Sequence, residues 1–375
     1  MNLLQSGMET AQLKASPAVM YSGERMELYR PSCLLLLFVA ALLTALAYCL
    51  KGTKLVSMFW AQEGERISET RYFVLPDERR IAFAIHGSLS ASLTVLYFHG
   101  TPSSHHEGFL LSEAAKRHGI RIISPSRPGS GGSDFRPGAS LLDYPDDILA
   151  LVDHLKIQRF GIVAVSGGAP YAFACWKRIA RSRLASLGII AGIYPVANLG
   201  TDGMKLPYRL MLRIATWFPG IVAWIIDKQL GAVARDEDEK KMEALLVKDM
   251  QHDSSAAQNE RVAWEEAKPE IRRAIVMSVR EGVKYGGKGA AWEMRLLGSH
   301  WGFDLDEVQP GQDGDLVMWH GDADANVPLV MAERAVARLG RHAELRIVEG
   351  QGHGTLTLHK ADEVMSTMKA NIRSR

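Results

Sequence analysis

Apolar and polar residues alternate along most of the chain in the order expected of a parallel sheet with helices on both faces. Short, nearly uninterrupted apolar runs are separated by stretches with apolar residues at helical spacing, as in LLDYPDDILALVDHL. Strands buried on both faces give such runs, and helices usually connect parallel strands. We predict an α/β fold whose strands are the runs LTVLYFHG, IRIISPSRPG, RFGIVAVS, LASLGIIAG, DLVMWHG and AELRIVEG.

The segments around these runs predict a hairpin and several helices. RYFVL and IAFAI, two β-rich runs, flank the turn-forming PDERR and indicate an antiparallel hairpin ahead of the first parallel strand. Pro170 suits the first turn of a helix that follows RFGIVAVS. Further helices are expected at about residues 106–117, 329–339 and 356–372.

The alternation stops at Tyr194 and resumes near residue 306. Between these points the chain keeps helical spacing, first through LPYRLMLRIATWFPGIVAWIIDKQL and then through more charged stretches. An insertion of this kind predicts a helical lid laid over strand ends. We therefore divide the globular part into a core of residues 69–193 and 306–375 and a lid of residues 194–305.

The lid segment 206–226 is rich in aromatic and aliphatic residues, among them Trp217, Phe218 and Trp224. Packing on the core is the simplest interpretation of this segment. It also fits the wall of an acyl-binding pocket, or a face that dips into a membrane.

Residues 31–50, PSCLLLLFVAALLTALAYCL, carry no charge and are long enough to cross a bilayer. We predict a transmembrane anchor here, after a polar tail of residues 1–30, and hence a single-pass membrane protein. Basic residues lie on both sides of the run, so charge does not set its orientation. The alternative is a signal peptide cleaved near Ala45–Ala47, which would give a secreted protein.

The bulk composition excludes several classes of protein. Of the 375 residues, 47% are hydrophobic and 23% are charged, which excludes a disordered chain. A net charge of +2 gives no reason to expect a nucleic-acid partner. The three cysteines, Cys33, Cys49 and Cys175, offer neither a disulfide framework nor zinc-ligand spacing. The composition indicates no oligomeric state.

Ser166 directly follows the GIVAV strand and precedes a helix, at the kind of strand end where α/β enzymes carry active sites. Small residues surround it in the pattern A-x-S-x-G, from Ala164 to Gly168, which lets a strand and a helix pack closely at a sharp turn. A serine in this position could equally cap the helix. The motif alone leaves both interpretations open.

Two later strand ends carry the partners that a nucleophilic serine needs. A serine requires a general base and an acid that orients the base. Asp324 follows the DLVMWHG strand, and His353 lies between glycines after the last strand. Asp322 competes with Asp324, and His353 could instead face solvent. The chain order Ser166, Asp324, His353 matches that of G-x-S-x-G hydrolases, so we predict a catalytic triad of these residues.

The loop HGTPSS after the first parallel strand is the predicted oxyanion loop. An oxyanion hole of this kind uses the N–H of the residue after the nucleophile and one from an early loop. Gly167 and Thr101 are the predicted donors, because Pro102 has no N–H. His99 is interpreted as a structural loop histidine rather than as a base.

The chain resembles the α/β-hydrolase superfamily, in particular its lidded branch with an H-G-x-P loop. The resemblance covers about residues 70–375 and rests on HGTPSS, SRPGSGGSD, VAVSGGAPYA, HGDADANVP and GQGHG. It implies the α/β-hydrolase fold, serine-dependent hydrolysis and Asp324 as the acid, three residues after Gly321. Ala164 departs from the usual glycine of the elbow. Dehalogenases and epoxide hydrolases of this fold carry aspartate at the elbow, so Ser166 argues against both activities.

We therefore expect a serine hydrolase that cleaves an ester-like bond of a small molecule with an apolar acyl group, through an acyl-enzyme and without a cofactor. Acyltransferases, thioesterases and carbon–carbon hydrolases or lyases use the same triad and remain open. An aminopeptidase-like hydrolase and a non-catalytic binding protein on the same fold are further alternatives. A metal site at His320, Asp322 and Asp324 is not expected, because further ligands at suitable spacing are missing.

Overall fold

The computed structural model describes residues 69–250, 255–308 and 314–373. The apolar run 31–50 lies outside these residues, so the membrane anchor and its alternative, a cleaved signal peptide, stay predictions. Among the described residues, no helix combines the length and the apolar character that a bilayer crossing requires.

One sheet of eight strands forms the centre of the described chain, in the order β1-β2-β4-β3-β5-β6-β7-β8. β1 and β2 are the predicted hairpin, and β2 also pairs antiparallel with β4, whereas the other neighbours are parallel. The predicted α/β fold with a mostly parallel sheet is thus confirmed. The strands are β1 (Arg71–Val74), β2 (Arg80–Gly87), β3 (Leu93–Phe98), β4 (Ile120–Pro125), β5 (Phe160–Val165), β6 (Leu184–Ile190), β7 (Leu316–Gly321) and β8 (Ala343–Val348).

The strand order reverses beside β3. β4 lies on one side of β3 and β5 lies on the other. The connection from β4 to β5 therefore crosses β3, and the later strands extend the sheet in the opposite direction. Loops diverge at such a point and leave a crevice beyond the carboxyl ends of the strands. The two loops here follow Phe98 and Val165, and they contain the predicted oxyanion loop and Ser166.

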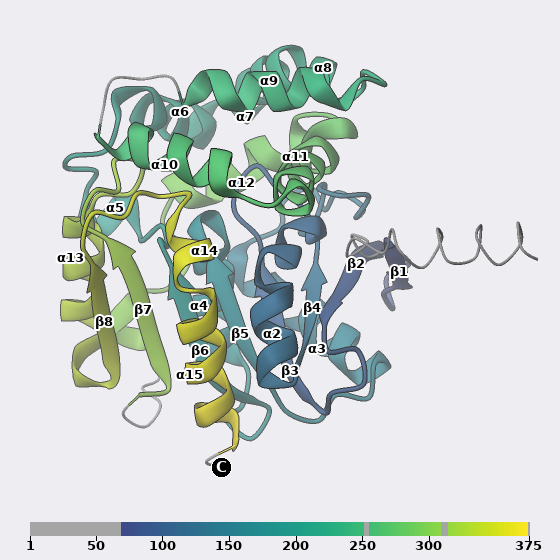
Figure 1. Cartoon of the computed structure of the whole chain (residues 1–375), viewed down its shortest axis with the longest axis vertical. Coiled ribbons are helices and arrows are strands. Elements are labelled where there is room, and N and C mark those ends of the chain that lie inside the picture. The colour runs from purple at the N-terminus through teal and green to yellow at the C-terminus, as the bar shows by residue number, and fades with distance from the viewer. Residues whose placement is uncertain (1–68, 251–254, 309–313, 374–375) are drawn as a thin grey trace, which may run out of the picture. The chain divides into compact units, whose positions relative to one another are not determined.

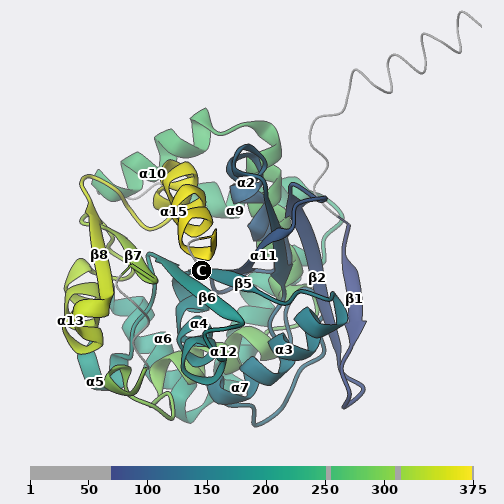
Figure 2. The ribbon, with the colours of Figure 1, turned by 90° about the horizontal axis from the view of Figure 1, so that it is seen from below.

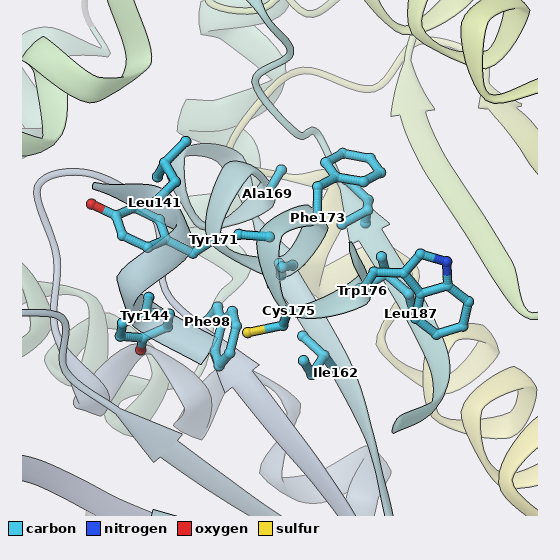
Figure 3. Close-up of a cluster of buried hydrophobic side chains, with 14 of the residues drawn as sticks. Phe98, Leu141, Tyr144, Ile162, Ala169, Tyr171, Phe173, Cys175, Trp176 and Leu187 are labelled. Atoms are coloured by element: carbon cyan, nitrogen blue, oxygen red, sulfur yellow. The ribbon is translucent and has the colours of Figure 1, made fainter. Parts of the chain in front are cut away.

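Helices cover both faces of the sheet, because the strands direct apolar side chains to both sides. Val95 and Tyr97 of β3 pack with α2 and α15, whereas Leu96 and Phe98 pack with α3 and α4. Figure 2 shows these two groups of helices on opposite sides of the sheet, and Figure 3 shows the cluster around Phe98. The covering helices are α2 (Ser112–His118), α3 (Tyr144–His154), α4 (Ala169–Arg178), α13 (Leu329–Leu339) and α15 (Ala361–Arg373).

A layer of helices lies over the carboxyl ends of the parallel strands (Figure 1). The run LPYRLMLRIATWFPGIVAWIIDKQL is helical, as predicted, with a break at Phe218, because Pro219 has no N–H with which to continue the helix. The closing helix expected at residues 356–372 likewise divides at Lys360, into α14 (Leu356–His359) and α15. The lid helices are α5 (Val196–Leu199), α6 (Leu206–Trp217), α7 (Pro219–Ile226), α8 (Ala232–Ala234), α9 (Glu239–Asp249), α10 (Ser255–Glu266), α11 (Pro269–Lys284) and α12 (Lys288–Gly298).

Gly168 allows α4 to start directly against the end of β3. A Cβ at this position would overlap the carbonyl oxygen of Phe98 and lie 2.9 Å from that of His99. Steric contact rather than backbone conformation therefore requires glycine here, since its φ is −75°. The contact holds the loop after β5 against the loop after β3, at the crevice described above.

We expect Gly168→Ala to lower the free energy of unfolding by about 1–3 kcal/mol, the usual cost of overpacking a close-packed site. Gly220→Ala in the first turn of α7 is the matched control, because no atom lies within 4 Å of its added Cβ. That change should raise stability by up to about 1 kcal/mol through backbone entropy. Denaturant unfolding followed by circular dichroism measures both variants, and equal effects at the two positions would contradict this account.

Candidate active site

Ser166 lies on a strained turn between β5 and α4. Its φ of 51° is in the left-handed region, which costs a non-glycine residue about 1–3 kcal/mol. The N-cap position of α4 is Gly168, so Ser166 is not the capping residue of this helix. The turn has the sharp strand-to-helix geometry expected from the A-x-S-x-G pattern.

The side chains of Ser166, His353 and Asp324 form one hydrogen-bonded chain. Ser166 Oγ lies 2.9 Å from His353 Nε2, and His353 Nδ1 lies 2.7 Å from Asp324 Oδ2. The other oxygen of Asp324 accepts hydrogen bonds of 2.9 Å from the backbone N–H groups of Asn326 and Val327. An ionised carboxylate can only accept hydrogen bonds, so Nδ1 of His353 must carry the proton that it donates to Asp324. In the neutral imidazole Nε2 is then unprotonated and can accept a hydrogen bond from the Ser166 hydroxyl.

His353 and Asp324 each favour the charged form of the other. Burial disfavours the His353 imidazolium, but the carboxylate of Asp324, with smaller contributions from Glu260 and Glu107, raises the pKa of His353 above 6.5. Burial also favours the neutral form of Asp324, yet the neighbouring His353 lowers the pKa of Asp324 below 3.8. Asp324 therefore stays ionised at neutral pH, while His353 can gain and lose a proton.

Asp322, the competitor of Asp324, has a different position. Its Oδ1 accepts a 2.7 Å hydrogen bond from the backbone N–H of Gly350, and it thus supports the loop that leads to His353. His320 is fully buried and its Nε2 lies 2.7 Å from the carbonyl oxygen of Val327. These contacts give both residues structural roles in the loops around Asp324.

Thr101 and Gly167 are neighbours beside Ser166. A Cβ on Gly167 would overlap Thr101 Oγ1 and lie 3.5 Å from Thr101 N. Both residues, together with Ser166 and His353, line a cavity of about 110 Å³. Thr101 and Gly167 thus border the same space beside Ser166, where donors to an oxyanion are needed, and their role as donors stays a prediction.

A buried ion pair fixes the loop that contains Thr101. Arg127 follows β4, Glu293 belongs to the lid helix α12, and their side chains are 0% and 3% exposed. Arg127 Nε donates to Glu293 Oε1 over 2.6 Å. The guanidinium also donates to the carbonyl oxygens of His99 and Gly100.

The Thr101 hydroxyl joins the same network. It accepts a 3.0 Å hydrogen bond from Arg127 Nη2 and donates a 2.7 Å hydrogen bond to Glu293 Oε2. Thr101 is therefore tied both to the core and to the lid. The position of its backbone N–H depends on a lid residue that is 192 positions away in the sequence.

His99 has the structural role expected for it. Its Nδ1 lies 2.8 Å from the carbonyl oxygen of Gly100, and its Nε2 accepts a hydrogen bond from the backbone N–H of Arg127. Burial and the nearby Arg127 charge hold the pKa of His99 well below 6.5, so the ring is neutral. It forms part of the loop and is not the base.

A second cavity, of about 250 Å³, also borders Ser166 and His353. The loops of the core and the lid helices α10 and α11 form its wall. Two carboxylates lie in this wall: Glu107 accepts from the backbone N–H of Gly100, and Glu260 accepts from that of Gly354. Most of the remaining wall is apolar, with Leu110, Val165, Trp264, Ile275, Val279 and Leu358.

Four residues of this site did not follow from the sequence: Glu107, Arg127, Glu260 and Glu293. Arg127 stands in the loop SRPGSGGSD at a strand end, which is a signal that could have identified it. Glu260 and Glu293 lie on amphipathic lid helices among many other charged residues. Only the packing of the lid distinguishes these two from solvent-facing glutamates.

Comparisons with known proteins agree with this architecture. A model of the alpha/beta hydrolase family matches residues 95–367. The uncharacterized hydrolase YcgS of Bacillus subtilis (strain 168) is 36% identical over 89 residues, which cover 22% of this chain and 31% of the relative. The chain thus matches less than a third of the length of this curated relative.

Two solved structures share the fold across most of the chain. Epoxide hydrolase A from Mycobacterium thermoresistibile has a TM-score of 0.58 at 16% identity, over 82% of this chain and 98% of its own. An esterase from Exiguobacterium antarcticum has a TM-score of 0.52 at 16% identity, over 81% of this chain and 100% of its own. At these identities the likeness shows the fold alone.

Removing Glu293 should destabilise the protein strongly, because the buried Arg127 charge would lose its partner. We expect Glu293→Ala to lower the free energy of unfolding by about 3–5 kcal/mol. Asp146→Ala is the control: it removes an exposed ion pair with Arg178, whose charged atoms are 3.8 Å apart, and should cost less than about 1 kcal/mol. Denaturant unfolding measures both, and similar small losses would contradict the role given to the buried pair.

Proposed function

The chain belongs to the alpha/beta hydrolase family, and on this basis we propose that it is a serine hydrolase that cleaves a carboxylic ester through an acyl-enzyme. The observation that carries the proposal is the hydrogen-bonded chain from Ser166 through His353 to Asp324, placed beside a mostly apolar cavity. The serine hydroxyl contacts the imidazole that would act as its base, and the imidazole contacts the carboxylate that would orient it. The epoxide hydrolase neighbour shares the fold but does not alter this assignment, since residue 166 is serine.

In the proposed reaction, Ser166 Oγ attacks the carbonyl carbon of the ester while His353 Nε2 takes the hydroxyl proton. Asp324 holds the tautomer of His353 and stabilises the imidazolium. The N–H groups of Thr101 and Gly167 donate to the oxyanion, a contribution of about 3 kcal/mol per donor in comparable sites. His353 then gives the proton to the leaving alcohol, and water hydrolyses the acyl-enzyme by the same steps. The reaction needs no cofactor.

The apolar lining of the larger cavity favours binding of the acyl group of the substrate there, and an apolar acyl group in particular. Its volume of about 250 Å³ is suited to a small molecule, and its lining is mainly aliphatic and aromatic. The smaller cavity, which Gly167 lines, would receive the other part of the ester. A thioester or an acyl acceptor other than water would fit the same groups.

An amine-bearing substrate is a second candidate, because Glu107 and Glu260 lie in the wall of the larger cavity. Such a pair of carboxylates is what an aminopeptidase-like hydrolase would use. Both already accept hydrogen bonds from the main chain, which favours the neutral acyl group. Hydrolysis of nitrophenyl hexanoate compared with nitrophenyl 6-aminohexanoate separates the candidates, and we expect the neutral ester to have the higher kcat/KM.

We also propose that the protein is a single-pass membrane protein, on the basis of the uncharged residues 31–50. Extraction of the expressed full-length chain with sodium carbonate and N-terminal sequencing of the product test this. An intact chain that stays in the membrane pellet agrees with an anchor. Release of a chain that begins after residue 47 would favour the cleaved signal peptide.

A fluorophosphonate probe should label the wild-type protein at Ser166, since an activated serine displaces fluoride from the phosphorus atom. Ser166→Ala should abolish labelling. Ser278→Ala is the matched control, because Ser278 lines the same cavity but donates its hydroxyl to the carbonyl oxygen of Ile275. Persistent label in Ser166→Ala would refute the nucleophile, and a wild type that never reacts would favour a binding protein.

The rate of ester hydrolysis should rise with pH through the pKa of His353, which lies above 6.5, because only the neutral imidazole can take the serine proton. Glu260→Gln removes a negative charge that raises this pKa and keeps an oxygen for the N–H of Gly354. We therefore expect the acid limb of the kcat/KM profile to move to lower pH.

Glu266→Gln, on the exposed side of the same helix, is the control for this shift. It should leave the acid limb in place. A profile that moves equally in both variants, or in neither, would contradict the electrostatic role of Glu260.

A further inference from the structure

The outer side of α6 is apolar where a surface helix is normally polar. Leu206, Leu210, Ile214 and Trp217 follow one another at intervals of four, four and three residues, so they form a single stripe. They are 62%, 47%, 37% and 78% exposed. The opposite side of the same helix is also apolar and is buried, through residues such as Leu212. Packing on the core therefore explains only one side of α6.

The stripe continues across the break at Phe218 onto α7. Phe218, Ile221 and Trp224 are 61%, 53% and 63% exposed, whereas Val222 and Ile226 face inward and are buried. We call the stripe on α6 together with these three residues the lid face: Leu206, Leu210, Ile214, Trp217, Phe218, Ile221 and Trp224.

The lid face differs from α9, another helix of the lid. On α9 the exposed residues are Lys240, Lys241, Ala244 and Lys248, as expected of a helix in water. A contiguous group of large apolar side chains, with two tryptophans, marks a surface that contacts another apolar phase or a partner. The interpretation of the segment as ordinary packing, the simplest one from the sequence, is therefore wrong for these residues.

Positive charges border the lid face. Lys205, Arg213 and Lys228 are exposed, and within the described part of the chain they make no ion pair. The two acidic residues of the sequence segment 200–230 pair with other cations. Asp202 pairs with Arg334 and Asp227 with Arg235, each over 2.8 Å. An apolar surface that is rich in tryptophan and bordered by unpaired cations is complementary to a bilayer with anionic headgroups.

The position of the lid face connects it to the candidate active site. Leu212, on the buried side of α6, and Tyr208, which is partly exposed, line the smaller cavity together with Ser166 and Thr101. The outer side of the same helix carries the stripe. Helix α6 alone therefore separates the lid face from the cavity beside Ser166 at this point.

We propose that the lid face docks on the surface of a membrane that contains anionic lipids, with Trp217, Phe218 and Trp224 inserted among the headgroups and upper acyl chains. Docking does not depend on catalysis, so it stands or falls independently of the proposed hydrolase function. The occupant is a lipid bilayer. A second copy of the chain or another protein on this face would overturn the proposal.

The test uses the full-length chain with Cys33→Ser and Cys49→Ser, in which Cys175 is retained because it is fully buried. A cysteine is introduced by Trp224→Cys and labelled with a nitrobenzoxadiazole fluorophore, whose emission reports the polarity around it. The control is Leu89→Cys, since Leu89 is 65% exposed and lies before the start of β3, at the opposite end of the strands from the lid. Vesicles contain phosphatidylcholine with brominated acyl chains and a minority of phosphatidylglycerol.

We expect the probe at position 224 to shift its emission to the blue and to lose most of its intensity to the bromine atoms, because quenching requires contact with the acyl chains. The probe at position 89 should show neither change, even if residues 31–50 tether both proteins to the vesicle. Arg213→Gln with Lys228→Gln should reduce the quenching at position 224, and so should vesicles without phosphatidylglycerol.

Two results would overturn the proposal. Identical behaviour of the probes at positions 224 and 89 would show that the lid face stays in water. A blue shift at position 224 without bromine quenching would show that protein rather than lipid covers the face. Circular dichroism checks that each variant is folded, and Ser166→Ala in the same background should leave the quenching unchanged.

Discussion

The buried contact between Arg127 and Glu293 joins three parts of the molecule that are separate in the sequence. Arg127 comes from the end of β4, Glu293 from the lid helix α12, and the hydroxyl of Thr101 lies between them. A charge pair removed from water is retained only when its geometry and remaining hydrogen bonds are satisfied. Here the guanidinium also holds the carbonyl oxygens of His99 and Gly100. The shape of the loop after β3 therefore depends on the lid helix α12 being in place.

The other components of the site are fixed by the sheet. The reversal of strand order beside β3 brings the loop after Phe98 and the turn at Ser166 together, and Gly168 lets them touch. Asp324 and His353 arrive from the ends of β7 and β8 and complete the hydrogen-bonded chain. The proposed reaction needs such fixed positions, because groups already in place stabilise a transition state best. The lid helices α10 and α11 form part of the wall of the larger cavity beside these groups.

Much of this arrangement is visible in the sequence because local patterns determine it. The apolar runs identify the parallel strands, and a serine, an aspartate and a histidine at strand ends in a fixed order identify the hydrogen-bonded chain. The lid is harder to predict, because amphipathic helices have similar patterns whichever neighbour they pack against. Nothing local distinguishes the buried Glu293 from the exposed Glu266. The same limit applies to Trp217 and Trp224, whose exposure depends on how α6 and α7 lie on α12.

The most direct test of this account is a crystal structure of the protein after reaction with a fluorophosphonate, whose phosphoryl oxygen imitates the oxyanion. We predict a covalent bond to Ser166 Oγ and a phosphoryl oxygen about 2.7–3.1 Å from both Thr101 N and Gly167 N. Arg127 and Glu293 should remain paired behind Thr101. An adduct on another residue, or a phosphoryl oxygen directed away from these two N–H groups, would contradict the account.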